Sequence, residues 1–374
     1  MKFEIKKCIR KNCEGFEPYI AGKPVETIKR ELGLKKVIKL ASNENPLGPC
    51  RAAIAAIQKA APRVYFYPDS NSWDLKQALA KKYAVDPASI IVGAGSDEII
   101  EVIGKVFFNP ADSIIVSRHA FVRYEMVGKL MGSTVITVPM KDGYTHDLLA
   151  MARAVTSTTK AIFVANPNNP TGTYNTTEEL EEFLSCVAQR SRKSLPLVVV
   201  DEAYYEYARV NKDYPDTLRL MKRYPNLIIL RTFSKIYGLA GLRVGYGFAD
   251  PEIVDYIDRI RPPFNVNFPA QVAAVASLSD STQVSRSLTL LEQEKLSICR
   301  ELDRWGIQFV PSAANFVLIN ISPLKGLDVF KRLLKEGVIV RAMDEYQLVN
   351  HIRVTIGTRA QNKMFLAALK KIVA

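Results

Sequence analysis

The clearest fold signal in the chain is the stretch Thr232-Phe-Ser-Lys-Ile-Tyr-Gly-Leu-Ala-Gly-Leu-Arg243, which follows the apolar run 227–230 after one residue. A continuous apolar run of this kind is typical of a strand covered on both faces of a mostly parallel sheet. Open α/β sheets bind ligands at the carboxyl ends of such strands. Because a lysine, two hydroxyls and an arginine follow this strand on a segment loosened by glycines, we expect the segment to bind a ligand.

A glycine turn earlier in the chain has the same position relative to a strand. Gly93-Ala-Gly-Ser-Asp-Glu98 joins a predicted strand ending at Val92 to a predicted helix. The backbone N–H groups at a helix start bind anions, so Ser96 and Asp97 can offer theirs to a phosphate. A tight, well-capped connection has the same sequence pattern, and by itself this turn indicates little.

Two more polar motifs follow predicted strands. Asn166-Pro-Asn-Asn-Pro-Thr-Gly172 comes after the run 161–165, and its prolines and glycine predict a rigid loop that presents asparagine amides. Asp201 comes after the run 197–200, where a carboxylate either binds a ligand or caps the next turn. The motifs in this order on one sheet predict a shared binding site much more specifically than any of them singly.

The wider pattern predicts an α/β fold with a second, smaller domain. Between about residues 73 and 250, apolar runs alternate with amphipathic stretches, as strands and crossover helices do in a mostly parallel sheet. We expect strands at 113–117, 161–165, 197–200 and 227–230, and helices at 72–83, 96–107 and 177–189, opened by the capping residues Ser72, Ser96 and Thr177.

The region after the Arg261-Pro262-Pro263 boundary signal changes character, which indicates a small α+β domain. There we expect helices at 284–305 and 328–336 and strands at 316–319 and 338–340.

Composition limits the function classes. The chain has 374 residues, 48% of them hydrophobic, which suits two domains. Its net charge of +13 comes from scattered pairs of basic residues, which favours a solvated basic surface over a nucleic-acid site. Five dispersed cysteines fit reduced thiols, and neither an apolar run of membrane-spanning length nor a secretory signal is apparent. We expect a cytoplasmic protein without a metal site, a nucleic-acid partner or a membrane partner.

Together these motifs resemble those of fold-type I aminotransferases dependent on pyridoxal phosphate (PLP), and among them the histidinol-phosphate aminotransferases. The resemblance covers almost the whole chain. It extends to Pro18-Tyr-Ile-Ala-Gly-Lys-Pro24, Ala41-Ser-Asn-Glu-Asn-Pro-Leu-Gly-Pro49, Tyr67-Pro-Asp69 and His351-Ile-Arg-Val-Thr-Ile-Gly-Thr358. It implies a large PLP-binding domain at 46–265 with a mostly parallel, seven-stranded type of sheet flanked by helices, and a small domain made from 1–45 and 266–374.

The resemblance also implies roles around the cofactor ring. Lys235 would form the imine with PLP and move the substrate proton, and Asp201 would keep the pyridine nitrogen protonated. Asn169 and Tyr204 would hydrogen-bond the phenolate oxygen, although either can be an ordinary turn or core residue. Phe121 would stack on the ring, where the family often has tyrosine, or belong to the core.

The remaining implied roles concern the cofactor phosphate and the subunit arrangement. The resemblance implies that three kinds of group bind the phosphate. These are the hydroxyls of Thr232 and Ser234, the guanidinium of Arg243, and the helix-start amides of Ser96 and Asp97. In the family, Tyr67 reaches the phosphate of the neighbouring subunit's cofactor. This implies a homodimer with shared active sites.

Two arginines match the positions that hold the anionic end of the substrate. Arg341 and Arg353 suit bidentate binding of a phosphate, with Tyr19 and Asn43 as further lining residues, although each arginine can also be a surface salt bridge. The implied reaction converts histidinol phosphate and 2-oxoglutarate to imidazole acetol phosphate and glutamate. Gln347, where related chains often carry glycine, is a departure from the family pattern.

Other functions use the same motifs. The nearest alternative is an aromatic amino-acid aminotransferase, followed by a PLP-dependent decarboxylase of the phosphothreonine type. A transcription regulator with an aminotransferase-like domain fits poorly, because few residues precede the motif that contains Tyr19.

Overall fold

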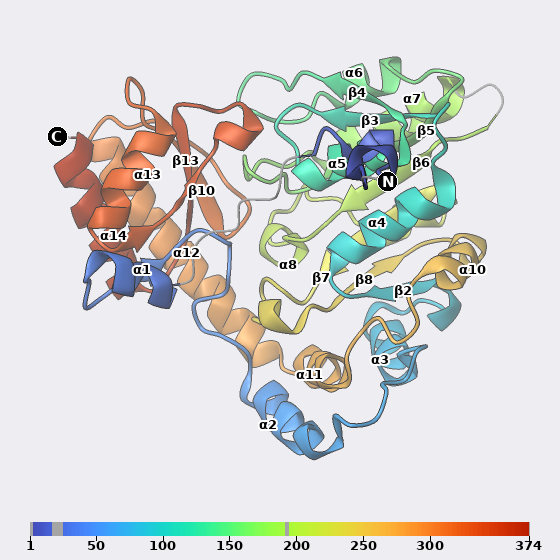
Figure 1. The fold of residues 1–374 in the computed structure, drawn as a ribbon, viewed down its shortest axis with the longest axis horizontal. Coiled ribbons are helices and arrows are strands. Elements are labelled where there is room, and N and C mark those ends of the chain that lie inside the picture. Colours follow the sequence, from blue (N-terminus) through green and yellow to red (C-terminus); the bar gives the residue numbers. More distant parts are fainter. Residues whose placement is uncertain (1–2, 17–24, 191–193, 374) are drawn as a thin grey trace.

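The computed structural model describes residues 3–16, 25–190 and 194–373, and it places a seven-stranded sheet at the centre of the molecule (Figure 1). The strand order is β2-β8-β7-β6-β5-β3-β4, and only β8 runs antiparallel to its neighbours. The strands are β2 (Ile90–Gly93), β3 (Ser113–Ser117), β4 (Thr134–Val138), β5 (Thr159–Ala165), β6 (Leu197–Asp201), β7 (Leu227–Thr232) and β8 (Gly245–Phe248). The predicted α/β class with a mostly parallel sheet is confirmed.

Helices cover both faces of this sheet, because its central strands are apolar on both faces. Along β6, Val198 and Val200 belong to the core under α6 and α7, whereas Val199 belongs to the core under α4, α5 and α10. These helices are α4 (Ser96–Phe107), α5 (Val122–Met131), α6 (Leu148–Arg153), α7 (Thr177–Arg190) and α10 (Pro251–Ile260). The continuous apolar runs in the sequence therefore reflect burial from two sides.

The predicted helices are present, but the three predicted capping residues do not cap them with their side chains, although Ser72 occupies the N-cap position of its helix. Ser72 has a left-handed φ of 50° and makes no capping bond to α3 (Trp73–Tyr83), and the N-cap of α4 is Gly95. Thr176 caps α7: its hydroxyl accepts from the Glu179 amide at 3.3 Å, while the Glu179 carboxylate accepts from the Thr176 amide at 3.1 Å. Thr177 instead donates its hydroxyl to the backbone at Asp213. The T-x-x-E spacing of a capping box indicates Thr176 in the sequence as well.

The C-terminal region forms a smaller sheet in the order β12-β13-β10-β9, packed with long helices. Its elements are β9 (Phe309–Val310), β10 (Phe316–Asn320), β12 (Arg341–Ala342), β13 (His351–Thr355), α12 (Ser281–Arg304), α13 (Gly326–Lys335) and α14 (Arg359–Val373). The strand predicted at 338–340 is shorter in the structure than predicted. Only Val338–Ile339 forms β11, which pairs in parallel with β1 (Ile38–Lys39), and the chain crosses to the other sheet at Arg341.

Segments that are distant in sequence join the two regions. Because β1 pairs with β11, the segment before residue 45 lies with the C-terminal sheet. In Figure 1, α12 runs from that sheet towards α11, and α11 packs on α2 and α3. The predicted division at 45/46 and 265/266 stays a prediction. The remaining helices are α1 (Val25–Leu32), α2 (Arg51–Ala60), α8 (Tyr205–Ala208), α9 (Thr217–Met221) and α11 (Phe268–Leu278).

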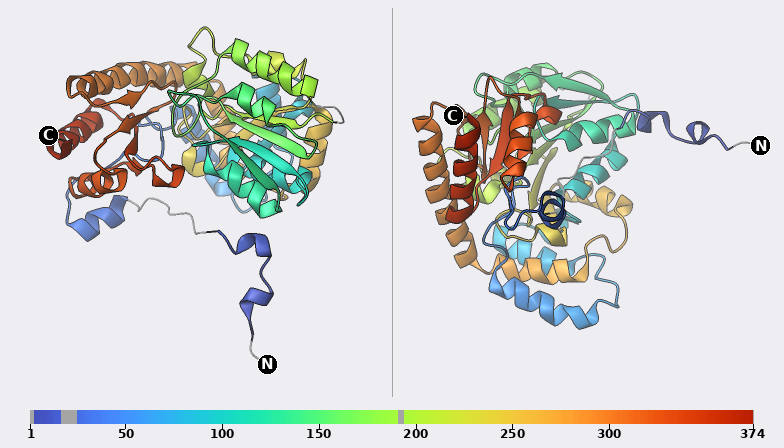
Figure 2. Two further views of the ribbon diagram at one scale, coloured as in Figure 1. Left: turned by 90° about the horizontal axis from the view of Figure 1, so that it is seen from above. Right: turned by 60° about the vertical axis from the view of Figure 1, so that its left-hand side comes forward.

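Residues 3–16 lie on the outside of the molecule, and their N-terminal part points away from its body (Figure 2). They contain two short 3-10 helices, η1 (Ile5–Lys7) and η2 (Lys11–Cys13), and η2 lies against α5. In the described ranges, no helix is both long and apolar enough to cross a membrane.

Candidate active site

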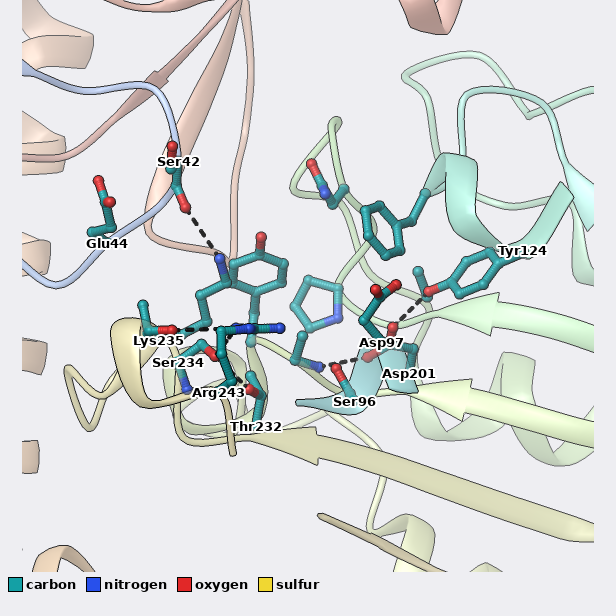
Figure 3. Close-up of a pocket in the computed structure, with 17 residues that line it drawn as sticks. Ser42, Glu44, Ser96, Asp97, Tyr124, Asp201, Thr232, Ser234, Lys235 and Arg243 are labelled. Atoms are coloured by element: carbon teal, nitrogen blue, oxygen red, sulfur yellow. Dashed lines mark hydrogen bonds between the residues drawn. The ribbon is translucent and has the colours of Figure 1, made fainter. Parts of the chain in front are cut away.

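A cavity opens at the carboxyl ends of β5, β6 and β7, and most of the predicted site residues line it (Figure 3). A second, larger cavity adjoins it towards the C-terminal sheet. The predicted residues in the first cavity are Ser96, Asp97, Phe121, Asn169, Asp201, Tyr204, Thr232, Ser234, Lys235 and Arg243. Those in the second are Asn43, Phe121, Asn169, Tyr204, Lys235, Arg341 and Arg353.

Lys235 stands in the loop after β7 and borders both cavities. Its ammonium group donates to the carbonyl of Ser42 at 3.2 Å (Figure 3). Removal from bulk water, together with the nearby charges of Arg353 and Arg243, lowers the pKa of Lys235 to about 8. The amine is therefore neutral in a sizeable fraction of molecules near neutral pH, as a nucleophile or base must be.

Asp201 is the last residue of β6, and its carboxylate is buried. The Tyr124 hydroxyl donates to one oxygen at 2.7 Å, and the Ala203 amide donates to the other at 3.1 Å. The prediction that Asp201 caps the next turn is thus partly correct, because its carboxylate accepts from an amide two residues further along the chain. Burial outweighs these bonds and raises the pKa of Asp201 to about 6. A buried carboxyl of this kind is suited to a cationic ligand group.

Backbone and side-chain donors surround one end of the first cavity. Gly95, at a φ of +86°, precedes α4, and a Cβ built on it would lie 2.5 Å from Nη2 of Arg243. The Arg243 guanidinium also donates to the Ser234 hydroxyl at 3.4 Å, and the Thr232 hydroxyl donates to Ser234 at 3.0 Å. A helix start, two hydroxyls and a guanidinium around a glycine make an anion cradle.

A hydrogen-bond network crosses from the large sheet to the C-terminal sheet beside Lys235. The Asn43 amide donates to the Tyr204 hydroxyl at 2.8 Å, and Thr355 donates to the Asn43 side-chain oxygen at 3.1 Å. Asn43 is buried in a left-handed conformation at a φ of 58°. Burial raises the pKa of Tyr204, so its hydroxyl stays protonated and able to donate.

The two predicted anion-binding arginines differ in their partners. Arg353 is buried; its guanidinium donates to the side-chain oxygen of Asn169 and to the Ala41 carbonyl, and its Nε has no hydrogen-bond partner in the described part of the chain. Arg341 forms two hydrogen bonds to the Glu345 carboxylate, at 2.7 and 3.2 Å. Arg341 therefore forms a salt bridge, as the alternative interpretation predicted, but this ion pair lies on the wall of the second cavity.

Several predicted residues lie outside the two cavities. Tyr67 is 82% exposed and stacks on Phe264 with ring centroids 4.7 Å apart. Tyr19 lies outside the described residues. Gln347 lines neither cavity and has a left-handed φ of 60°, which accounts for glycine in related chains at this position.

Tyr124 and Glu345 are among the residues in these contacts that the sequence predictions missed. Tyr124, the hydrogen-bond donor to Asp201, lies three residues after Phe121 in the same motif; Phe121 is the N-cap residue of α5, and its ring meets that of Tyr124 edge-on with centroids 5.7 Å apart. Glu345, the partner of Arg341, follows it by four residues in a region with no helical pattern, and no sequence signal identifies it.

Solved structures similar to this chain include aminotransferases, and together with the site they define an enzyme of that class. Histidinol-phosphate aminotransferase from Sinorhizobium meliloti, solved in complex with pyridoxal-5'-phosphate, is similar at a TM-score of 0.86, with 28% identity over 96% of this chain and 98% of that chain. The enzyme of the same name from Clostridium acetobutylicum is similar at a TM-score of 0.81, with 25% identity over 90% of this chain and 99% of that chain.

Sequence comparisons give the family. The model described as "Aminotransferase class I and II" matches residues 35–369. Histidinol-phosphate aminotransferase from Moorella thermoacetica is 46% identical over 99% of this chain and 94% of its own length. Histidinol-phosphate aminotransferase 2 from Carboxydothermus hydrogenoformans is 46% identical over 98% of this chain and 99% of its own length. The chain belongs to the class I and II aminotransferase family, in the group of histidinol-phosphate aminotransferases.

Proposed function

We propose that the chain binds PLP and transfers an amino group from histidinol phosphate to 2-oxoglutarate, giving imidazole acetol phosphate and glutamate. The observation that carries the substrate assignment is the buried guanidinium of Arg353, whose Nε has no partner in the described residues and which shares a cavity with Lys235. An unpaired buried donor is costly unless a ligand accepts from it. An anionic group close to the reactive lysine satisfies this requirement.

The side chains of the first cavity fit PLP. The buried Asp201 has no cationic partner within ion-pair distance in the described ranges, and a protonated pyridine nitrogen supplies one. The space next to Gly95, which a Cβ would fill against Arg243, fits a phosphate. When bound, PLP supplies an electron-withdrawing ring that stabilises negative charge at the substrate Cα.

Protein groups then hold and move protons around this ring. We propose that Lys235 Nζ takes the proton from the substrate Cα and returns it on the other side of the transfer, which a pKa of about 8 permits. The Asp201 carboxylate would keep the ring nitrogen protonated. Tyr204 and Asn169 would donate to the phenolate oxygen, and Phe121, on the wall of both cavities, would stack on the ring.

The second cavity supports a phosphate-bearing substrate. Arg353 and Arg341 both line it, and guanidinium groups bind phosphate with paired hydrogen bonds. We propose that they hold the phosphate of histidinol phosphate and, in the second half-reaction, a carboxylate of 2-oxoglutarate. Asn43, which positions Tyr204, also lines this space.

An aromatic amino-acid aminotransferase is the second candidate. It is favoured by the apolar part of the same cavity, where the side chains of Ile28, Phe330 and Leu334 lie. Apolar walls bind an aromatic ring without contributing to phosphate recognition.

We also propose that the enzyme is a cytoplasmic homodimer. Tyr65, Phe66 and Tyr67 are consecutive aromatic side chains with 75%, 60% and 82% exposure, and exposed apolar patches of this kind mark interfaces. In a dimer Tyr67 would reach the partner's cofactor phosphate. The five cysteines are free thiols, which suits a reducing compartment.

Steady-state kinetics test the substrate. With 2-oxoglutarate as acceptor, we expect kcat/KM for histidinol phosphate to exceed that for phenylalanine or tyrosine by about 10-fold or more, because a phosphate dianion pairs with both Arg353 and Arg341 more strongly than a single carboxylate does. No more than a trace of turnover with histidinol phosphate would overturn the assignment. Release of carbon dioxide without an oxo-acid acceptor would indicate the decarboxylase instead.

A further inference from the structure

The two arginines of the second cavity have different electrostatic partners. Arg353 bonds to an amide and a backbone carbonyl, both neutral, and no carboxylate lies within ion-pair distance of it in the described residues. Arg341 is already paired with a carboxylate, since Nη2 and Nε both donate to Glu345. Among the described residues, the Arg353 guanidinium thus has no charged partner, whereas the Arg341 guanidinium is paired with a carboxylate of the protein.

The structure fixes the backbone that carries Glu345. Glu345 lies in the 3-10 turn η6 (Asp344–Tyr346), which directly follows β12. The Tyr346 carbonyl lies 2.5 Å from Nδ1 of His119, and the Met343 amide donates to the His351 carbonyl. Both ends of the turn are therefore held by contacts with other segments. A change of partner for Arg341 thus requires only side-chain rotation.

The partial exposure of the ion pair to solvent also favours replacement of Glu345 by another anion at Arg341. The Arg341 and Glu345 side chains are 18% and 32% exposed, and both border the cavity that contains Lys235. A carboxylate here is partly solvated, so separating it from Arg341 costs much less than in a closed core.

We propose that Glu345 is an exchangeable counter-ion that pairs with Arg341 between ligands and gives up this place to the anionic group of each substrate. The inference rests on the proposed function, in which one pocket binds and releases anionic ligands twice in each catalytic cycle. With Glu345 in place, the cluster of Arg341, Arg353 and Glu345 carries one net positive charge, and without it the cluster would carry two. Because Glu345 competes with a bound anion for Arg341, the affinity of the pocket for anions is lower than it would be without Glu345. This permits release of an anionic product.

Direct binding to the PLP-loaded enzyme tests this. Isothermal titration calorimetry measures the affinity for three ligands that lack an amine. They are phenyl phosphate, phenylacetate and benzyl alcohol, which carry about two, one and no negative charges. For E345Q we expect about 3-fold tighter phenylacetate binding and about 10-fold tighter phenyl phosphate binding, because Coulomb energy scales with ligand charge. Benzyl alcohol affinity should not change. Unchanged or weaker phenyl phosphate binding would overturn the proposal.

Two further variants separate the possible failures. D344N removes an equal charge from a neighbouring residue that lines the same cavity but forms no ion pair with Arg341, and it should change phenyl phosphate affinity less than 2-fold. An effect as large as that of E345Q would refute the counter-ion role. R353Q should weaken phenyl phosphate binding at least 10-fold; if it does not, the proposed anion site itself is wrong, independently of Glu345.

Discussion

Replacement of Asp201 by asparagine should stabilise the PLP-free protein although it damages the enzyme. Burial raises the pKa of Asp201 to about 6, above the ordinary value of 3.8, so the folded protein binds this proton more tightly than the unfolded chain does. Ionised Asp201 therefore opposes folding above pH 6. The penalty fades as the pH falls from 6 towards 3.8, because the carboxyl is then protonated in both states.

The size of the effect follows from the pKa difference. A difference of about 2 pKa units corresponds to about 3 kcal/mol at pH 8. Asparagine keeps one oxygen to accept from either Tyr124 or Ala203, and the loss of the other bond costs about 1 kcal/mol. We expect Asp201→Asn to raise the free energy of unfolding by about 2 kcal/mol at pH 8, and the gain to vanish near pH 4.5.

Urea unfolding of both PLP-free proteins at pH 8 and pH 4.5 measures this difference. Added PLP should reverse the order, because asparagine does not hold a proton on the ring nitrogen as a carboxylate does. Asp97→Asn is the matched control: Asp97 lines the same cavity but pairs with Arg123 at 2.6 Å, so its replacement should give no gain. A variant less stable than the wild type at pH 8 would refute the burial argument.

Three other expectations follow from the same contacts. Because the pKa of Lys235 is lowered to about 8, the rate of covalent PLP capture, measured by absorbance, should increase about 10-fold from pH 7 to pH 9. Lys235→Ala should abolish this capture, and a rate that does not change with pH would contradict the lowered pKa. Gly95→Ala should raise the PLP dissociation constant at least 10-fold in equilibrium dialysis, since its Cβ would lie 2.5 Å from Arg243; wild-type affinity would show that the cradle is misassigned. Arg231→Met should lower the free energy of unfolding by about 3–5 kcal/mol, because it leaves the buried Glu202 carboxylate without its 2.8 Å partner, and adding Glu202→Gln should restore part of the loss.

The sequence alone was sufficient for β2, β3, β5, β6 and β7 of the large sheet and for the residues at their ends, whereas β4 and β8 were not predicted. Apolar runs bounded by polar motifs mark buried parallel strands, and the carboxyl ends of such strands meet at one edge. For this reason the positions of Lys235, Asp201 and Asn169 in one cavity could be predicted before any contact was known. These are consequences of local pattern and of one topological rule.

The partners of these residues required the tertiary structure. Asn43 bonds to Tyr204, 161 positions away. The apolar run 338–340 forms a strand only at Val338 and Ile339, the two residues that pair with β1, and Arg341 already pairs with β13 in the other sheet. Glu345 pairs with Arg341 because the 3-10 turn η6, which follows β12, places its side chain beside Arg341 on the cavity wall. Periodicity and capping signals describe the chain within a few residues, whereas such contacts depend on how distant segments pack, and packing has no local signature.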